Sequence, residues 1–189
     1  PLKVVELDFE SVAYLRENFP QLGDHIIEQD FLKMDLRQLF DGQPFVLTGN
    51  YPYNISSQIF FKMLDYKDLI PCCTGMIQKE VAERMVAEPG HKIYGALSVS
   101  VQYYTQPQML FEISPKCFMP APEVTSAVVA MDVRQQPPVD LIDEKRFFQV
   151  VKAAFQQRRK TFSNTLKGAG VSKDDIQQIL AASGIDGSR

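Results

Sequence analysis

The sequence is poor in the residues that build disulfide frameworks and zinc sites. Its 189 residues include three cysteines, two histidines and no tryptophan. The cysteines are Cys72, Cys73 and Cys117, an odd number in which no two are spaced as a CxxC pair. This pattern indicates buried thiols in a reducing compartment. We therefore expect a cytoplasmic protein that holds no metal ion.

Long apolar runs are also missing. No stretch approaches the roughly 18 apolar residues that a membrane-spanning helix needs, and no signal-peptide pattern opens the chain. The composition, 45% hydrophobic and 23% charged, is that of an ordinary globular protein. The length fits one domain of normal size and a small second one. We expect no association with a membrane.

A third absence is a glycine-rich phosphate-binding loop, since no GxGxxG pattern occurs anywhere in the chain. The order of elements nevertheless predicts an α/β fold. Short apolar runs at 4–7, 26–27, 45–48 and 72–78 alternate with helical patterns at 9–19, 56–66 and 79–87. Ser56 or Ser57 is the expected N-cap of the second helix. A further helix is predicted at 94–105, and strands at 108–113 and 125–133. Such alternation is typical of a doubly wound, mainly parallel sheet.

The C-terminal part differs in composition. Residues 134–140, "RQQPPVD", form a polar linker, and the pattern beyond it is purely helical. We expect one domain over 1–135 and a small helical domain over 136–189. Although the net charge is −3, the segment from Lys145 to Lys173 contains eight basic residues and no acidic one. A basic segment on an acidic body indicates a polyanionic partner, although a solvated helix face is the alternative. The candidate contacts to such a partner, called the basic set below, are Lys152, Arg158, Arg159 and Lys160.

Three predicted strands end at or near a polar side chain: Glu6, Asp30 and Asn50. In open α/β sheets, ligands bind in the crevice at the carboxyl ends of the strands. An acid at the end of the second strand of a nucleotide-binding fold accepts hydrogen bonds from ribose hydroxyls. An acid after the next strand could accept from an adenine amine. Either acid alone is better explained as a solvated strand end.

The third of these strands runs into Asn50-Tyr51-Pro52-Tyr53, whose chemistry is more specific. The exocyclic amine of adenine is a poor nucleophile because its lone pair is delocalised into the ring. Two acceptors, the Asn50 side-chain oxygen and the Tyr51 carbonyl, would favour a nitrogen with an available lone pair. Pro52 stiffens the turn, and Tyr53 can stack on a base. The tetrapeptide therefore predicts a site that holds a flat amine.

Five segments resemble the ribosomal RNA adenine dimethyltransferases, in their bacterial small-subunit branch. They are "VELD", "EQDFL", "GNYPYNISS", "QKEVAERMVAEPGHKIYGALSVSVQYY" and "CFMPAPEVTSAVV". The resemblance covers nearly the whole chain. It implies a Rossmann-like class I methyltransferase domain followed by a small helical domain. The implied activity is methyl transfer from S-adenosylmethionine to the N6 atoms of two adjacent adenines near the 3′ end of 16S rRNA. The implied partner is the small ribosomal subunit, and we expect a monomer.

The resemblance also implies roles for single residues. Glu6 would bind the cofactor ribose, and Asp30 would bind its adenine amine. Asn50 would touch both the cofactor and the target amine, and Tyr53 would stack on the target base. Phe118, in "FMPAPEVTS", would close over the other face of the flipped base; without the resemblance it would be interpreted as a core phenylalanine.

The chain departs from the family pattern at two points. Tyr51 stands where the family usually has Leu or Ile. This should matter little, because the group that accepts a hydrogen bond from the target amine is the backbone carbonyl. The glycine-rich cofactor loop of the family lies upstream of the ribose-binding acid, which here is already residue 6. We therefore expect a chain trimmed at both ends, without the strand that lies between those ending in Glu6 and Asn50. Such a chain should bind S-adenosylmethionine poorly by itself and could lack activity.

Three other functions compete with this interpretation. One is a large-subunit rRNA adenine methyltransferase, which differs only in its substrate. The second is an rRNA-binding assembly factor without catalysis. The third is an adenine-N6 DNA methyltransferase, which shares the Asn-Pro-Tyr chemistry; the basic helical tail and the segment "FMPAPEVTSAVV" argue against it.

Overall fold

The computed structural model of the chain describes residues 1–156, 160–168 and 170–187. It divides into two compact units. The first unit comprises Pro1–Ala82 and Thr105–Val133, and the second comprises Glu83–Tyr104 and Arg134–Arg189. Helix α4 therefore groups with the C-terminal helices, although the predicted boundary near residue 135 placed it in the first domain. The division into a catalytic and an RNA-binding domain stays a prediction.

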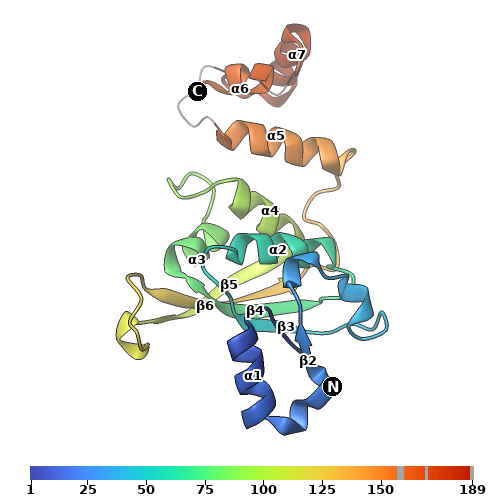
Figure 1. The fold of residues 1–189 in the computed structure, drawn as a ribbon. Helices are drawn as coiled ribbons and strands as arrows, with labels where there is room; N and C mark the ends of the chain where they lie inside the picture. Colours follow the sequence, from blue (N-terminus) through green and yellow to red (C-terminus); the bar gives the residue numbers. More distant parts are fainter. Residues whose placement is uncertain (157–159, 169, 188–189) are drawn as a thin grey trace. The chain divides into compact units, whose positions relative to one another are not determined.

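The first unit begins with two parallel strand pairs, each connected through a helix (Figure 1). Strand β1 (Val4–Glu6) pairs with β2 (Ile26–Glu28) through helix α1 (Phe9–Asn18) and the 3₁₀ helix η1 (Pro20–His25). Strand β3 (Leu47–Asn50) pairs with β4 (Cys72–Gln78) through α2 (Ser56–Asp65). The short 3₁₀ helices η2 (Phe31–Lys33) and η3 (Leu36–Gln38) connect the two pairs. This arrangement confirms the predicted α/β class.

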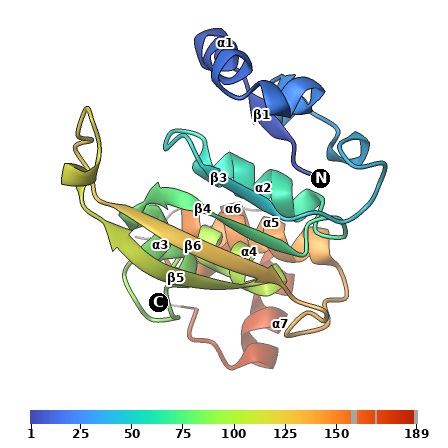
Figure 2. The same ribbon diagram turned by 90° about the horizontal axis from the view of Figure 1, so that it is seen from below.

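Strands β5 (Thr105–Ile113) and β6 (Ser126–Val133) complete a four-stranded sheet in the order β3-β4-β6-β5, which can be followed in Figure 2. Strand β6 runs antiparallel to both of its neighbours, β4 and β5. The end of β5 and the start of β6 therefore lie at the same edge of the sheet as the carboxyl ends of β3 and β4. The loop between β5 and β6, with the 3₁₀ helix η4 (Pro115–Cys117), emerges at this edge.

Within the described residues, β1 and β3 do not pair, so β1-β2 forms a separate two-stranded sheet. The expected strand between them stays a prediction.

The core of the first unit forms where α2 covers one face of the four-stranded sheet (Figure 1). Apolar residues at helical spacing on α2 are buried, namely Ile59, Phe60, Met63 and Leu64. On β4 and β6 every second residue is buried, as the two-residue period of a strand requires. The register places Cys73 beside Met131 and Ile77 beside Ala127. These buried positions fix which face of β4 carries the core.

Two helix starts differ in how they are capped. Helix α1 begins after Asp8, whose carboxylate accepts a hydrogen bond from the Ser11 amide at 2.8 Å. Hydrogen bonding from Ser11, by its side chain and by this amide, lowers the pKa of Asp8. The prediction that Ser56 or Ser57 caps α2 is wrong. Ile55 is the N-cap, without a side-chain hydrogen bond, and the Ser56 hydroxyl donates to the Tyr53 carbonyl at 3.3 Å. The serine is engaged by the preceding turn.

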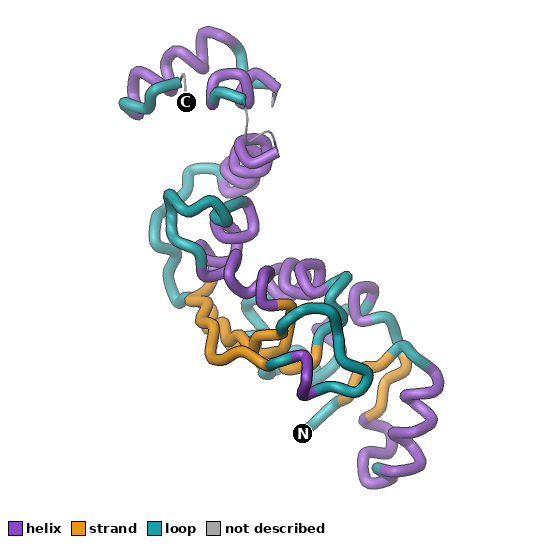
Figure 3. The backbone as a smooth tube through the Cα atoms, turned by 90° about the vertical axis from the view of Figure 1, so that its left-hand side faces the viewer, coloured by secondary structure: helices purple, strands orange, loops and turns teal. Residues whose placement is uncertain are grey.

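Within its described residues the second unit contains helices and loops but no strand (Figure 3). It contains α4 (Ala96–Tyr104), α5 (Glu144–Gln156), α6 (Phe162–Gly168) and α7 (Lys173–Ser183), while α3 (Lys79–Val86) spans the border between the units. Leu166, Val171 and Ile176 form its buried cluster. Helix α7 begins after Ser172 and ends at Gly184, whose φ of 66° is typical of a helix C-terminus. Among the described helices, none has the length and apolarity that crossing a bilayer requires.

Candidate functional site

An open groove of about 350 Å³ lies at the edge of the four-stranded sheet where β3 and β4 end. The turn after β3 and the loop between β5 and β6 supply most of its lining. The groove is lined by Asn50, Tyr51, Pro52, Tyr53, Met76, Phe118, Pro120 and Pro122. The sheet thus brings together two segments that lie more than sixty residues apart in the sequence.

Asn50 is the last residue of β3, and its side chain is exposed. Its register partner on β4 is Met76, which also lines the groove. Among the described residues, no backbone N–H donates to the carbonyl of Tyr51. The amide oxygen of Asn50 and this carbonyl can therefore both accept hydrogen bonds from a ligand.

The side chain of Tyr51 is buried, and only 6% of the residue's surface is exposed. Its hydroxyl donates to the Thr74 carbonyl at 2.9 Å and lies 3.3 Å from the Cys73 sulfur. Burial raises the pKa of Tyr51 and that of Cys73, the latter to about 12. Both groups are thus protonated at neutral pH and serve packing rather than acid–base chemistry.

Tyr53 is half-buried, and its hydroxyl is hydrogen-bonded to the hydroxyl of Ser126, the first residue of β6. Ser126 is completely buried. The bond ties the aromatic ring to the sheet, so the ring orientation is defined from two directions, by its own backbone turn and by β6. A ring held in this way can offer a face for stacking without losing rotational freedom on binding.

Phe118 is half-buried in the loop between β5 and β6, and its amide donates to the Pro115 carbonyl at 3.1 Å. It lines the same groove as Tyr53. A Met119–Pro120 cis peptide follows it. The groove therefore contains two aromatic rings from separate elements, as a site that holds a flat base requires.

Glu6 and Asp30 do not line the groove. One carboxylate oxygen of Glu6 accepts from the amides of Leu7 at 2.7 Å and Asp8 at 2.9 Å. Asp30 caps η2 by accepting from the Leu32 amide at 2.9 Å, and its other oxygen lies 3.4 Å from the Lys33 ammonium. Glu6 is the last residue of β1 and Asp30 lies two residues after β2. Each acid keeps acceptor capacity for a hydroxyl or amine donor. Their predicted roles in cofactor binding stay predictions.

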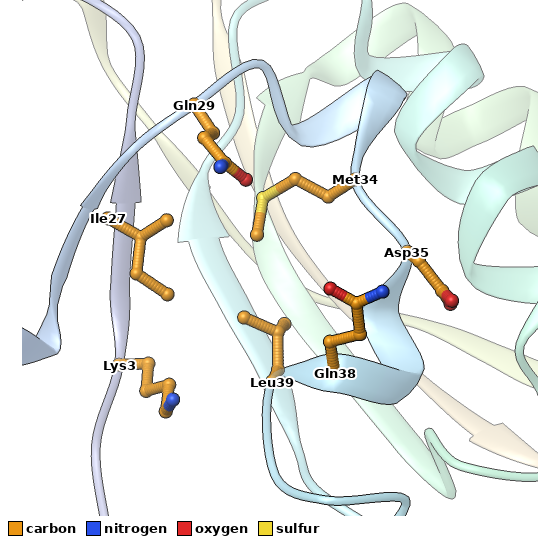
Figure 4. Close-up of a pocket in the computed structure, with 7 residues that line it drawn as sticks. All are labelled: Lys3, Ile27, Gln29, Met34, Asp35, Gln38 and Leu39. Atoms are coloured by element: carbon orange, nitrogen blue, oxygen red, sulfur yellow. The ribbon is translucent and has the colours of Figure 1, made fainter.

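A second pocket, of about 200 Å³, lies beside the β1-β2 sheet (Figure 4). Ile27 and Gln29 face Met34 and Leu39 across it. Its lining contains none of the predicted site residues and consists of Lys3, Ile27, Gln29, Met34, Asp35, Gln38 and Leu39. These side chains form no recognisable catalytic arrangement.

The basic set is only partly described. Lys152, on α5, and Lys160, which follows it, are exposed. Arg158 and Arg159 lie outside the described residues. Among the described residues, no three His, Cys, Asp or Glu side chains gather in a way that could hold a metal ion.

Met76, Gly75 and Ser126 are neighbours of the site that the sequence did not predict. Gly75 carried a usable signal, since a glycine inside a strand often marks a close approach of another group. Ser126 lies within the segment "CFMPAPEVTSAVV", but its contact with Tyr53 depends on the pairing of β4 with β6. Pairing between distant strands cannot be recognised from a local pattern.

Comparison with known proteins gives a consistent result. The family model described as "Ribosomal RNA adenine dimethylase" matches residues 2–187. Two relatives, both called "Ribosomal RNA small subunit methyltransferase A", come from Phocaeicola vulgatus and Bacteroides thetaiotaomicron. Each is 63% identical over 166 residues, or 88% of this chain. The match covers 59% of the first relative and 62% of the second, so the chain spans about three fifths of their length.

Two solved structures share the fold. A dimethyladenosine transferase from Plasmodium falciparum superposes with a TM-score of 0.70 at 24% identity, covering 94% of this chain and 62% of that one. The 23S rRNA methyltransferase ErmE superposes with a TM-score of 0.68 at 22% identity, covering 98% of this chain and 73% of that one.

Proposed function

The chain belongs to the ribosomal RNA adenine dimethylase family, and from this premise we propose that it transfers methyl groups to adenine in ribosomal RNA. The proposed donor is S-adenosylmethionine, and the proposed targets are the N6 atoms of two adjacent adenines near the 3′ end of 16S rRNA. The observation that supports this most strongly is the meeting of Asn50, Tyr53 and Phe118 in one groove. A protein that only binds RNA would not need these three groups together.

The groove suits the chemistry of an aromatic amine. The amide oxygen of Asn50 and the carbonyl of Tyr51 accept hydrogen bonds from the two N–H groups of the target amine. This favours a nitrogen whose lone pair is free to attack. Tyr53 and Phe118 hold the flipped base by stacking, which contributes about 1–3 kcal/mol per base. Preorganised acceptors of this kind act in the transition state, where the nitrogen becomes positively charged.

When bound, S-adenosylmethionine supplies an electrophilic methyl group on a sulfonium sulfur. The Asn50 amide oxygen and the Tyr51 carbonyl would hold the target amine with its lone pair directed at this methyl group, and the amine would release its proton to water. Repetition with a second donor molecule gives the dimethylated amine. Because the displacement is direct, the chain needs no nucleophilic side chain of its own.

Glu6 and Asp30 fit the nucleoside end of this cofactor. Both are carboxylates at or just after the ends of parallel strands, and both retain capacity to accept from hydroxyl or amine donors. We propose that Glu6 accepts from the ribose hydroxyls and Asp30 from the adenine amine.

The basic set is proposed to bind the phosphate backbone of the ribosomal RNA. The described members, Lys152 and Lys160, are exposed and available for this. Eight basic residues without an intervening acid would attract RNA electrostatically to one segment of an otherwise acidic chain. We also propose that the protein is cytoplasmic and monomeric.

The test uses a chimera in which this chain replaces the 166-residue region that it matches in the Phocaeicola vulgatus relative. The chimera is expressed in a bacterial strain whose rRNA lacks the dimethylated adenines. Mass spectrometry of the rRNA nucleosides should detect N6,N6-dimethyladenosine, and primer extension on 16S rRNA should stop at two adjacent adenines. The unaltered Phocaeicola vulgatus protein is the positive control.

Three other outcomes would contradict the proposal. Dimethyladenosine confined to 23S rRNA would assign the chain to the large subunit. A folded chimera that binds 16S rRNA but leaves it unmethylated would indicate an assembly factor. Methylation of DNA adenine in place of rRNA would indicate the third alternative.

A further inference from the structure

The side chain of Tyr51 lies over two glycines on neighbouring strands. A Cβ atom built at Gly49, on β3, would come within 2.9 Å of the Tyr51 ring. One built at Gly75, on β4, would come within 2.2 Å of the ring and 2.6 Å of the Gly49 carbonyl oxygen. Real Cβ atoms essentially never approach another heavy atom to less than 3.0 Å. The two glycines are paired in the sheet, so together they form a flat surface without side chains on which one aromatic ring packs.

Tyr51 is bonded to β4 at two points on either side of Gly75. Its backbone amide donates to the Met76 carbonyl at 3.1 Å, and its hydroxyl donates to the Thr74 carbonyl at 2.9 Å. The edge of the ring also contacts Phe60 of α2, with centroids 5.6 Å apart and planes at 87°. The residue thus joins the turn after β3 to β4 through its backbone, its hydroxyl and its ring.

We infer that the Tyr51 side chain is a positioning residue, which fixes the Asn50–Tyr53 turn against β4 and thereby sets the places of the Asn50 amide and the Tyr51 carbonyl. The catalytic consequence rests on the proposed function, whereas the positional consequence does not. Gly49 and Gly75 are required because they leave room for the ring. The role differs from that of the Tyr51 carbonyl, which touches the substrate itself.

The anchored ring lies close in the chain to the reacting groups. Asn50 and the Tyr51 carbonyl belong to the same short segment as this side chain, so a shift of the Tyr51 backbone after loss of these contacts would displace them. Displacement of a catalytic group by about 1 Å can lower a rate about a hundredfold. Loss of the hydroxyl alone removes one neutral hydrogen bond, which corresponds to a change of about two- to tenfold in an equilibrium or a rate.

The experiment compares four variants of the chain: Tyr51→Phe, Gly49→Ala, Tyr51→Leu and the double variant Gly49→Ala/Tyr51→Leu. Gly49 is chosen over Gly75 because the three atoms nearest to its added methyl group all belong to the ring, whereas at Gly75 a backbone oxygen is among them. The first readout is the NMR signal of the Asn50 side-chain amide in the ¹⁵N-labelled chain. The second is the free energy of unfolding in denaturant. The third is kcat and KM for methyl transfer, measured in the chimera described above.

We expect Tyr51→Phe to shift the Asn50 signal and to lower kcat about two- to tenfold, with KM for RNA and for the cofactor unchanged. Gly49→Ala should lower both stability and kcat. Its destabilising effect should be smaller when Tyr51→Leu is already present, because the smaller side chain leaves space for the methyl group. The matched controls are Tyr14→Phe, at an exposed tyrosine of α1, and Gly168→Ala. At Gly168, among the described residues and apart from its chain neighbours and its own helix backbone, no atom lies within 4 Å of the added Cβ.

The inference fails if Tyr51→Phe leaves both the Asn50 signal and kcat at wild-type values. It also fails if the effects of Gly49→Ala are the same with and without Tyr51→Leu. An unsubstituted chimera that transfers no methyl group would refute the proposed function instead. In that case the Asn50 signal and the unfolding free energies of the chain itself still decide whether Tyr51 positions the turn.

Discussion

The side chain of Tyr53 makes two contributions that can be measured separately. Its ring can stack on the substrate base, and its hydroxyl is hydrogen-bonded to Ser126. Tyr53→Ala removes the aromatic face, and base stacking of this kind contributes about 1–3 kcal/mol. A difference of about 1.36 kcal/mol is a factor of ten, so kcat/KM should fall about 5- to 150-fold. Tyr53→Phe keeps the face but removes the hydroxyl that bonds to the completely buried Ser126. Because the buried Ser126 hydroxyl then loses this partner, the free energy of unfolding should fall by about 1–3 kcal/mol.

A double-mutant cycle in the chimera measures the bond directly. Tyr53→Phe and Ser126→Ala remove the same interaction, so the double variant should be no less stable than the worse single variant. Chemical denaturation gives the free energies of unfolding of the two single variants and the double variant, each relative to the unsubstituted chimera. Single-turnover methyl transfer gives kcat/KM. If Tyr53→Ala kept the wild-type kcat/KM, or if Tyr53→Phe lowered it as much as Tyr53→Ala, stacking by this ring would be refuted.

Three further predictions concern RNA, thiols and the cofactor. Neutralising the basic set should weaken RNA binding and reduce the log–log salt slope by about 0.7–0.9 for each phosphate that the variant no longer neutralises; an unchanged slope would make these residues a solvated helix face. Burial raises the pKa of Cys73 to about 12, so a thiol reagent at mildly alkaline pH should label the exposed Cys117 far faster than Cys73, and equal rates would contradict the structure. Because the folded state keeps a proton that the unfolded thiol releases, the stabilising contribution of the neutral thiol should be complete below about pH 8.5 and decline as pH rises towards 12. Calorimetry on the isolated chain should detect no micromolar binding of S-adenosylmethionine, since the sequence contains no glycine-rich loop for its methionine end; a micromolar Kd would show that expectation to be wrong.

Much of the fold could be predicted from local patterns. The strand over 72–78 was predicted with the bounds that β4 has, because a strong helical pattern begins directly after it. The site turn was predicted because Asn50, Pro52 and Tyr53 form a chemically unusual group within four residues. Local sequence is informative where the function is carried by neighbours in the chain.

The features that escaped prediction depend on interactions between distant segments. The hydrogen bond of Tyr53 with Ser126 requires the register of β4 with β6. The packing of the Tyr51 ring requires two glycines on different strands. The N-cap of α2 was mispredicted because the Ser56 hydroxyl bonds to the preceding turn, not to the helix. The separation of the β1-β2 sheet from the other strands likewise has no local signature.

The central claim is that the turn after β3 carries out methyl transfer, and Asn50→Ala in the chimera tests it most directly. Asn50 is exposed, so its removal should change the free energy of unfolding by no more than about 0.5 kcal/mol. Loss of one preorganised polar group typically costs about 2.7–4 kcal/mol in the transition state, which is a factor of about 100 to 1,000 in rate. The measurement is the single-turnover rate of methyl transfer to 16S rRNA at saturating RNA, together with the RNA affinity of the same variant. We expect the rate to fall by that factor at unchanged affinity, and a wild-type rate would contradict the assignment of this turn as the catalytic site.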